Sequence, residues 1–318
     1  MRKLVIGTRG SALALWQAHY IQDRLLQECG VESSLEIIKT KGDKILDVPL
    51  AKIGGKGLFT KELEEKLLTR EIDLAVHSLK DVPVDLPESL ALACITERED
   101  VRDCFVSYKY PDFNALAQNA RVGTTSLRRS MQLKARRADI ACLSLRGNIQ
   151  TRLNKLESGE FDAIILAYAG LKRLGIAHIP HIVPLSTTEM IPAMGQAALG
   201  IECREDDEDL CAVLETLACQ KTALCTQAER EFIKVLDGGC QVPIGVHCEL
   251  LGEMEAGMVQ IKAIVGMPDG SKVLQESIST SAQEASIAAK ELAHILIKQG
   301  AREVLEQAQR FFLQAWGS

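Results

Sequence analysis

The segment from Arg121 to Tyr168 alternates between strand-like and helix-like patterns, and this alternation constrains the fold most. Short apolar runs are separated by stretches whose apolar residues recur every three or four positions. The predicted order is strand, helix, strand, helix, strand, at 122–123, 127–138, 140–145, 149–156 and 163–168. Because strands joined through a helix run parallel in one sheet, the segment predicts a parallel α/β unit.

The rest of the chain predicts another α/β unit and a smaller α+β unit. The expected strands lie at 3–7, 35–39, 73–79, 91–95, 104–107, 197–203, 246–251, 259–266 and 273–280, and the expected helices at 12–29, 60–69, 206–219, 222–236 and 282–299. Proline and glycine before residue 197 indicate that the chain returns there to its first domain. We therefore expect two α/β domains, 1–96 with 197–218 and 101–191, and a smaller α+β carboxyl-terminal domain, 219–318.

The composition is that of a globular protein with a sizeable core. Of the 318 residues, 47% are hydrophobic, enough for a core in each of several domains. The chain starts Met1-Arg2-Lys3, and only four apolar residues follow before Thr8 and Arg9, too few for a signal peptide or a membrane anchor. We expect a cytoplasmic protein without a membrane partner.

Cysteine and histidine spacing predicts neither disulfides nor a metal centre. The ten cysteines include no C-x-x-C pair, so reduced thiols are expected. Among the six histidines only His178 and His181 lie close together, and no second pair of ligands accompanies them. We expect no metal site.

Positive charge is concentrated in one segment of an acidic chain. The net charge is −6, yet residues 121–155 contain nine Lys and Arg residues and a single acid, Asp139. The acidic total, the 4% of aromatic residues and the lack of a recognisable binding module argue against a nucleic-acid partner. A small polyanion fits better, because a guanidinium group pairs with both oxygens of a carboxylate. For Arg136 and Arg137 we expect only a solvated surface.

Several of these cations lie where helices begin. Thr124 to Ser126 opens one predicted helix and Gly147-Asn148 opens the next, which places four arginines near two helix amino termini: Arg128, Arg129, Arg146 and Arg152. A helix start presents free N–H groups and a positive dipole end to an anion. The junction between the first strand and the first helix, with Arg9 and Ser11, has the same character.

Two further stretches are candidates for the site. The strand at 73–79 runs into Lys80, Asp81 and Pro83, and ligands of open α/β sheets lie beyond the carboxyl ends of strands. Asp81 could instead serve only as a turn residue. The glycine-rich stretch 53–58 is either a mobile flap over the site or an ordinary turn.

The stretch Leu236 to Gly245 presents one cysteine differently from the others. Two glycines precede Cys240 and Pro243 follows it, so the backbone turns sharply and exposes the thiol. None of the other nine cysteines is flanked by two glycines and a proline in this way, and most of them fall in strand or helix patterns typical of buried structural thiols. Cys240 is the candidate functional thiol, with a structural role as the alternative.

Six motifs together give the chain a family resemblance over essentially its whole length. They are Arg9-x-Ser11-x-Leu-Ala, Gly54-Gly-Lys-Gly-Leu-Phe59, His77-Ser-Leu-Lys-Asp-Val-Pro83, Gly123-Thr-Thr-Ser-Leu-Arg-Arg129, Leu145-Arg-Gly-Asn148 and Gly238-Gly-Cys-Gln-Val-Pro-Ile-Gly245. In this order and spacing the sequence resembles the porphobilinogen deaminase family, also called hydroxymethylbilane synthases. One departure is Ala12, where many members have proline.

The resemblance implies a fold, a reaction and a cofactor. The first two domains would be similar to the halves of a periplasmic binding protein, and the protein would be a monomer. A dipyrromethane cofactor would be attached through a thioether to Cys240. The enzyme would be a transferase of porphyrin and heme biosynthesis that joins four porphobilinogen molecules, releases ammonia at each addition, and yields the linear tetrapyrrole hydroxymethylbilane.

The resemblance also implies residue roles. Asp81 would be the catalytic carboxylate. The cofactor would contact Gln17, Asp43, Ser78, Lys80, Asp81, Thr124, Ser126, Arg128 and Arg129. The substrate would contact Arg9, Ser11, Lys56, Arg146, Arg152, Arg173 and Gln196. Acetate and propionate groups make porphobilinogen chains polyanionic, which agrees with the concentrated positive charge.

Two other functions stay open at this point. A cysteine hydrolase would need a base beside Cys240, and His247 on the following strand is the one candidate nearby. A pure anion-binding protein would leave Cys240 and the third domain without a role.

Overall fold

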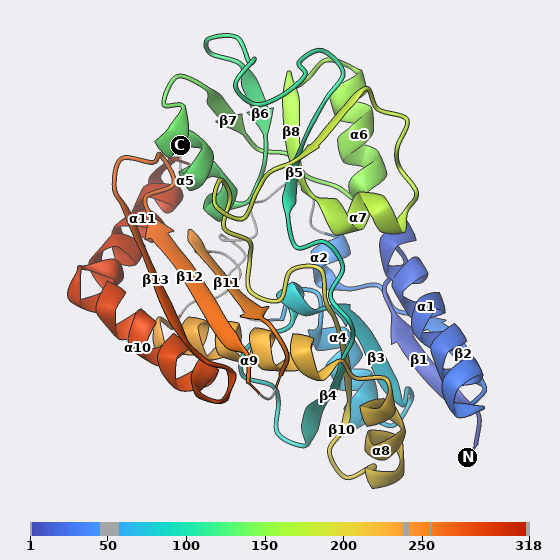
Figure 1. Ribbon diagram of the computed structural model, residues 1–318. Helices are drawn as coiled ribbons and strands as arrows, with labels where there is room; N and C mark the ends of the chain where they lie inside the picture. The colour runs from blue at the N-terminus through green and yellow to red at the C-terminus, as the bar shows by residue number, and fades with distance from the viewer. Residues whose placement is uncertain (1, 45–56, 238–241, 255, 316–318) are drawn as a thin grey trace. The chain divides into compact units, whose positions relative to one another are not determined.

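The computed structural model describes residues 2–44, 57–237, 242–254 and 256–315 (Figure 1). The chain divides into two compact units. The first comprises Met1–Val48, Gly54–Glu99 and Gly195–Leu224, and the second comprises Pro49–Ile53, Asp100–Met194 and Cys225–Ser318.

The first unit is built on a five-stranded mixed sheet. Its elements are β1 (Leu4–Thr8), α1 (Ala12–Cys29), β2 (Ser33–Ile37), α2 (Lys41–Lys44), α4 (Lys61–Leu68), β3 (Leu74–Ser78), the 3₁₀ turn η1 (Leu79–Asp81), β4 (Leu90–Ile95), β10 (Leu199–Arg204), α8 (Glu208–Thr216) and the start of α9 (Gln220–Val235). The strand order is β2-β1-β3-β10-β4. Strands β1, β2 and β3 are parallel, and β10 runs antiparallel to both of its neighbours.

Side chains of β3 alternate between the two faces of this sheet. Leu74 and Val76 belong to the core that includes α1 and α8, whereas Ala75 packs with Leu63 and Leu67 of α4. Period-two alternation in a strand covered on both faces explains the continuous apolar run in the sequence. The sheet therefore has helices on both faces.

The second unit contains a sheet with the same strand order. Its elements are β5 (Asp103–Ser107), β6 (Arg121–Gly123), α5 (Leu127–Arg136), β7 (Ala141–Leu143), α6 (Ile149–Glu157), β8 (Ala163–Ala167), α7 (Tyr168–Arg173) and β9 (His181–Pro184). The order β7-β6-β8-β5-β9 again has three parallel strands followed by one antiparallel strand. The two sheets thus repeat one topology, although the sequence contains no repeat.

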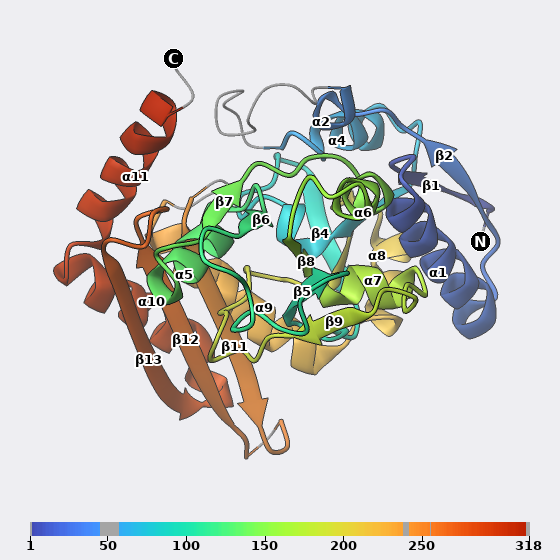
Figure 2. The same ribbon diagram turned by 90° about the horizontal axis from the view of Figure 1, so that it is seen from above.

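A three-stranded antiparallel sheet completes the second unit (Figure 2). It consists of β11 (Ile244–Leu251), β12 (Met258–Gly266) and β13 (Val273–Ser281), followed by the turn η2 (Ala282–Glu284), α10 (Ala285–Lys298) and α11 (Ala301–Ala315). A hairpin turn joins β12 to β13, where Gly266 pairs with Val273. Its Pro268 carbonyl accepts a hydrogen bond from Ser130 of α5 at 3.0 Å.

The α/β architecture with a smaller α+β part agrees with the expected fold class. Three helices and one strand were not predicted: α2, α7, α11 and β9. Gly300, with φ of +98°, ends α10 as expected, but a second helix begins at the next residue. Strand β9 was not predicted because it is short and ends in proline.

No helix in the described ranges is long and apolar enough to cross a membrane.

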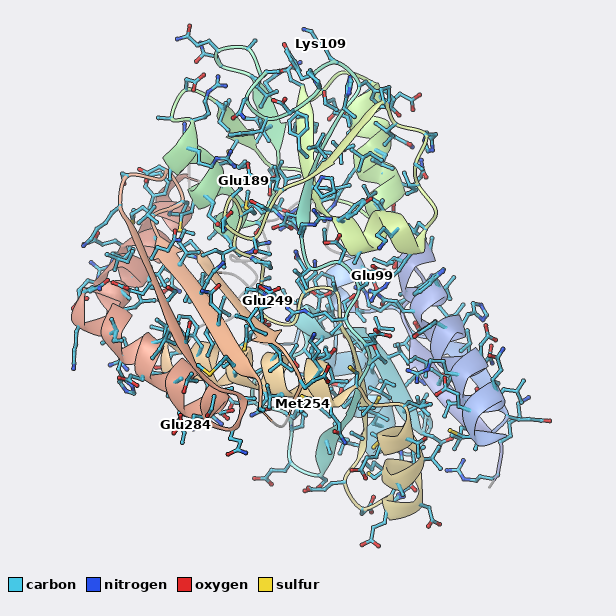
Figure 3. All side chains as sticks on the ribbon, in the orientation of Figure 1. Glu99, Lys109, Glu189, Glu249, Met254 and Glu284 are labelled. Carbon is cyan, nitrogen blue, oxygen red and sulfur yellow. The ribbon has the colours of Figure 1, made fainter. Side chains whose placement is uncertain are left out.

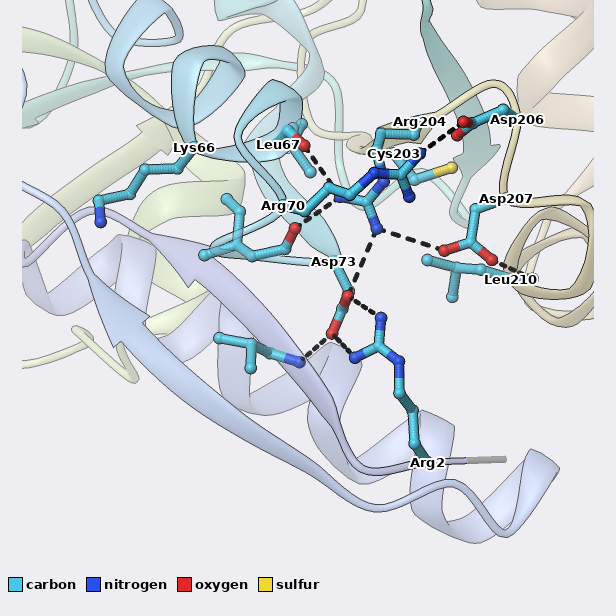
Figure 4. A network of polar contacts seen from close by, with 12 residues as sticks. Arg2, Lys66, Leu67, Arg70, Asp73, Cys203, Arg204, Asp206, Asp207 and Leu210 are labelled. Atoms are coloured by element: carbon cyan, nitrogen blue, oxygen red, sulfur yellow. Dashed lines mark hydrogen bonds and ion pairs between the residues drawn. The ribbon is translucent and has the colours of Figure 1, made fainter.

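A network of charged groups around Asp73 ties the strands of the first unit together (Figure 4). The buried Asp73 carboxylate accepts hydrogen bonds from Arg2 at 2.9 Å and from the Val5 N–H at 2.8 Å. Arg204 of β10 lies 3.4 Å away and also donates to the carbonyls of Leu67 and Ile72. Burial opposes ionisation, but these donors hold the pKa of Asp73 below its ordinary value.

We predict that Asp73→Asn lowers the free energy of unfolding of the first unit by about 3 kcal/mol at neutral pH, because it removes the carboxylate that Arg2 and the buried Arg204 share and leaves Arg204 only its pairing with Asp207. A carboxyl with a depressed folded pKa stabilises above its unfolded pKa of about 3.9, and the stabilisation is lost as the pH falls through the folded value. The difference between the two proteins, measured by urea unfolding, should therefore shrink in acid.

Asp206→Asn is the matched control, since Asp206 and its partner Arg70 are both exposed and lie in the same view (Figure 4). An exposed pair contributes at most about 1 kcal/mol. Equal losses in the two variants would contradict the assigned role of Asp73.

Candidate functional site

The carboxyl end of β3 positions three of the predicted site residues in the first unit. The strand ends at Ser78, and η1 then buries Leu79 while Lys80 and Asp81 stay partly exposed. The Leu79 N–H donates to the Ala198 carbonyl at 3.0 Å, which fixes the turn to the segment entering β10. The structure therefore presents a cation and a carboxylate side by side at a strand end.

Helix α1 supports this strand end from one face. Gln17 is buried and its Nε2 donates to Ser78 Oγ at 2.9 Å. Ser11 caps the helix by accepting the Ala14 N–H at 3.3 Å. Gln17 and Ser78, both expected to contact the cofactor, are thus in mutual contact.

Arg9 and Asp43 form an ion pair in the first unit. The Arg9 Nε lies 3.2 Å from both Asp43 oxygens, and its guanidinium carbon lies 4.2 Å from the centre of the Phe59 ring. Thr40 Oγ1 donates to Asp43 at 2.8 Å. Burial opposes ionisation, but Arg9 and Thr40 hold the pKa of Asp43 below its ordinary value. Arg9 is therefore oriented by a carboxylate and an aromatic face.

The segment 195–198 packs against the turn that carries Asp81. Gly195 adopts φ of +66°, and a Cβ atom there would lie 2.8 Å from Leu79 Cγ. Ala197, with φ of +75°, is in the left-handed region that favours glycine. Gln196 is buried, and its carbonyl accepts from Arg98 Nε at 2.8 Å. Strained backbone is thus held against the strand end.

In the second unit the predicted loop before α5 has the expected capped form. Ser126 accepts the Arg129 N–H at 3.4 Å, and Thr124 Oγ1 accepts the Ser126 N–H at 3.2 Å. Both residues lie at the carboxyl end of β6 (Arg121–Gly123). The amino terminus of α5 is therefore placed as an anion site requires.

Arg128 and Arg129 share one buried carboxylate, that of Asp103. Arg128 Nη1 donates to it at 2.7 Å, and Arg129 donates from Nη2 at 2.7 Å and from Nε at 3.0 Å. Asp103 has no exposed surface. Burial would raise the pKa of Asp103, but the two guanidinium groups hold it well below its ordinary value. Asp103 was not among the predicted site residues; the available indication was an acid at the first position of an apolar strand.

The segment after Cys240 contacts the same region within the second unit. The Val246 N–H donates to the Pro192 carbonyl at 3.0 Å, and the Ile191 carbonyl accepts from Arg128 Nη1 at 2.7 Å. A Cβ atom on Gly245 would lie 2.9 Å from that Ile191 oxygen. Cys240 and Lys56 themselves lie outside the described residues.

Arg146, Arg152 and Arg173 are all partly exposed. Burial lowers the pKa of Arg146, so this cation is partly removed from water. Arg152 Nε donates to the Gly147 carbonyl at 2.8 Å, next to the Asn148 cap of α6. Arg173 ends α7. These arginines differ from Arg128 and Arg129, which are bound to Asp103.

Other cations of the basic segment are paired at the surface. Arg136 lies 3.1 Å from Glu189, which is labelled in Figure 3, and Arg137 lies 2.6 Å from Asp139. The hydrogen bond from Arg137 lowers the pKa of Asp139 to about 2. Glu189 outside the segment and Asp139 inside it therefore neutralise part of the positive charge that the sequence concentrates there.

The candidate base of a cysteine hydrolase and groups of metal-binding side chains can be looked for among the described residues. His247 is buried, with Nδ1 3.4 Å from a carboxylate oxygen of Glu229. Within the described ranges no three His, Cys, Asp or Glu side chains are grouped as metal ligands.

These features define a class: an α/β protein with two sheets of one topology, each with polar and cationic groups at the carboxyl ends of its parallel strands. Two family models match, the dipyromethane cofactor binding domain of porphobilinogen deaminase over residues 4–212 and its C-terminal domain over 223–298. The chain belongs to the porphobilinogen deaminase family.

Curated relatives cover nearly the whole chain. The porphobilinogen deaminase of Helicobacter acinonychis is 57% identical over 98% of this chain and 100% of its own, and that of Helicobacter hepaticus is 58% identical over 97% and 96%. Among solved structures, the periplasmic VFT2 domain of Bordetella pertussis BvgS has a TM-score of 0.41 at 12% identity, over 68% of this chain and 85% of that one.

We predict that Gly195→Ala lowers the rate of porphobilinogen consumption about ten- to a hundredfold, because the new Cβ displaces Leu79 and the turn that carries Asp81. Gly30→Ala is the matched control: Gly30 has the same φ of +66° with no atom within 4 Å. It should lose about 1 kcal/mol of stability and no activity. Equal rates of porphobilinogen consumption in the two variants would mean that the 195–198 segment does not position the site.

Proposed function

We propose that the chain carries out the porphobilinogen deaminase reaction with the roles below. Family membership over almost the full length is the observation that carries this proposal. The enzyme is a transferase of tetrapyrrole biosynthesis that joins porphobilinogen units with loss of ammonia. We further propose that it acts as a monomer in the cytoplasm.

Cys240 is the proposed attachment point for the dipyrromethane. The contact of the following segment with Ile191 and Pro192, beside Arg128, supports this, because carboxylate side chains on the group would meet N–H donors and cations there. When bound, the dipyrromethane supplies the terminal pyrrole to which substrate is added. Lys56 is proposed as a further contact to substrate.

The arginines are proposed to divide into two groups. Arg128 and Arg129, oriented by Asp103, hold the cofactor together with Thr124 and Ser126. Partial burial makes Arg146 a cation that gains from an added carboxylate, and we assign it to substrate. The same assignment is proposed for Arg152, Arg173, Arg9, Ser11 and Gln196.

Asp81 is the proposed catalytic carboxylate. Loss of ammonia from porphobilinogen leaves an electron-poor cation, and the attacking pyrrole becomes cationic as the new bond forms. A fixed negative charge near the pyrrole N–H groups stabilises both steps, and the carboxylate can carry a proton to the departing amine. Gln17, Ser78, Lys80 and Asp43 are proposed to orient the cofactor around it.

We predict that Cys240→Ser yields a folded protein whose intact mass equals that of the bare chain and which consumes no porphobilinogen. Without the thiol the thioether cannot form. Cys248→Ser is the control, because Cys248 is buried in β11 and its loss should leave the added two-pyrrole mass in place. An adduct retained by the Cys240 variant would place the attachment elsewhere.

We predict that Asp81→Asn keeps the fold and the cofactor mass but loses at least about a hundredfold in kcat, since removal of one electrostatic stabiliser costs this much. Asp81→Glu should retain measurable turnover, because the charge remains. Single-turnover kinetics with porphobilinogen measure both. Full activity of the Asn variant would leave Asp81 as a turn residue only.

A further inference from the structure

A group of buried polar side chains lies behind the strand end that carries Ser78, Lys80 and Asp81. His77 of β3 and Glu202 of β10 are 5% and 0% exposed, and His77 Nε2 lies 3.1 Å from Glu202 Oε2. Glu64 of α4, 7% exposed, and the fully buried Thr60 join them. The proposed reaction uses none of the four.

The strand register accounts for this grouping. Ala75 faces α4, so His77 two residues later faces α4 as well, whereas Ser78 faces α1 and meets Gln17. Glu202 pairs with Ala75 across the antiparallel β3–β10 ladder and therefore shares its face. His77 and Ser78, which are adjacent in the sequence, thus lie on opposite faces of the sheet.

This group of buried side chains has more hydrogen-bond acceptor oxygens than it has N–H or O–H donors to pair with them. Glu202 Oε1, Glu64 Oε1 and Thr60 Oγ1 are buried and make no hydrogen bond of normal geometry. Arg204, two residues after Glu202 in β10, donates to the Leu67 carbonyl of α4 but is already paired with Asp73 and Asp207. Two ionised carboxylates beside one imidazole would therefore leave a surplus negative charge in this layer even if the imidazole were protonated, which is costly. A proton on Glu64 removes that surplus and supplies a donor.

The surroundings of Glu64 favour this proton. Burial raises the pKa of Glu64, the nearby Thr60 hydroxyl lowers it, the Glu202 charge raises it, and His77 lowers it, with a net increase. Glu65 on the same helix adds a smaller increase. Strands β1 and β4, which also border this layer, carry no charged side chain.

We propose that His77, Glu202 and a neutral Glu64 form a positioning cluster that fixes the end of β3 and, through it, the turn that presents Asp81. The inference rests on the proposed function. Glu202 holds β10 to β3 from the α4 side, while Leu199 of the same strand pairs with Ser78 and the preceding Ala198 carbonyl binds Leu79. The three side chains touch no substrate in this assignment and act through the backbone.

The first test is the pH dependence of stability. A carboxyl with a raised folded pKa stabilises fully below its unfolded pKa, and the stabilisation is lost as the pH rises through the folded value. In that window the unfolding equilibrium constant of the parent protein should rise by up to about tenfold per pH unit more than that of Glu64→Gln, which keeps a neutral side chain. Urea unfolding between about pH 5 and about pH 8 measures this difference.

Glu65→Gln is the matched control, because Glu65 is exposed and adjacent on the same helix. It should follow the parent protein at every pH. If Glu64→Gln also follows the parent, Glu64 is not the neutral acid and the cluster is wrong.

The second test is catalytic. Glu202→Gln should lower kcat per cofactor-loaded enzyme about ten- to a hundredfold, change KM for porphobilinogen less than about twofold, and alter the pH profile of kcat. A merely structural residue would reduce the amount of folded enzyme and leave kcat and its profile unchanged, which would overturn the positioning role. If Glu202→Gln does not fold, the Glu64→Gln comparison decides.

The two proposals fail separately. A parent protein that consumes no porphobilinogen would overturn the proposed function, while the unfolding measurements would still test the cluster. An active parent with a Glu202→Gln variant of unchanged kcat and pH profile would overturn only the positioning role.

Discussion

The second unit depends on the pairing of Asp103 with Arg128 and Arg129. A carboxylate without exposed surface is costly to ionise, and the two guanidinium groups stabilise its charge there. The same contacts tie the start of β5 to the first turn of α5, and Arg129 adds a bond to the Ile165 carbonyl of β8 at 3.0 Å. The loop before α5 can therefore present its N–H groups in a fixed direction, which an anion site needs.

This pairing changes what the concentration of positive charge means. A count of charged residues along the sequence treats every arginine as equal. In the structure some arginines are bound to acids, and Arg146 is partly removed from water. Arg137 pairs with Asp139 and gains little from another anion, whereas burial has lowered the pKa of Arg146. An acidic chain can thus hold a polyanion, because binding depends on a few cations in low-dielectric surroundings rather than on net charge.

Local patterns predicted the elements that local physics determines. Ser11 and Gly30 bracket α1 as cap residues do, and the strand and helix alternation after Arg121 gave the parallel order of β6, β7 and β8. The sequence did not reveal that both sheets share one topology, nor that Asp103 binds two arginines. These features depend on contacts between residues far apart in the chain, and no periodicity records such contacts. The roles of Cys240 and Asp81 came from the family resemblance and stay predictions.

The antiparallel strand in each sheet explains why these long-range contacts fall at the site. Because β10 runs opposite to β3, its first residue, Leu199, pairs with Ser78 at the carboxyl end of β3. In the same way Asp103 at the start of β5 pairs with Ala167 at the end of β8. Each inserted strand therefore brings its entering backbone to the edge where ligands of parallel sheets bind. In the first unit this strand entry supplies the strained segment at Ala197, and in the second unit it supplies the carboxylate for Arg128 and Arg129, so the same topological feature recurs beside the candidate residues of each unit.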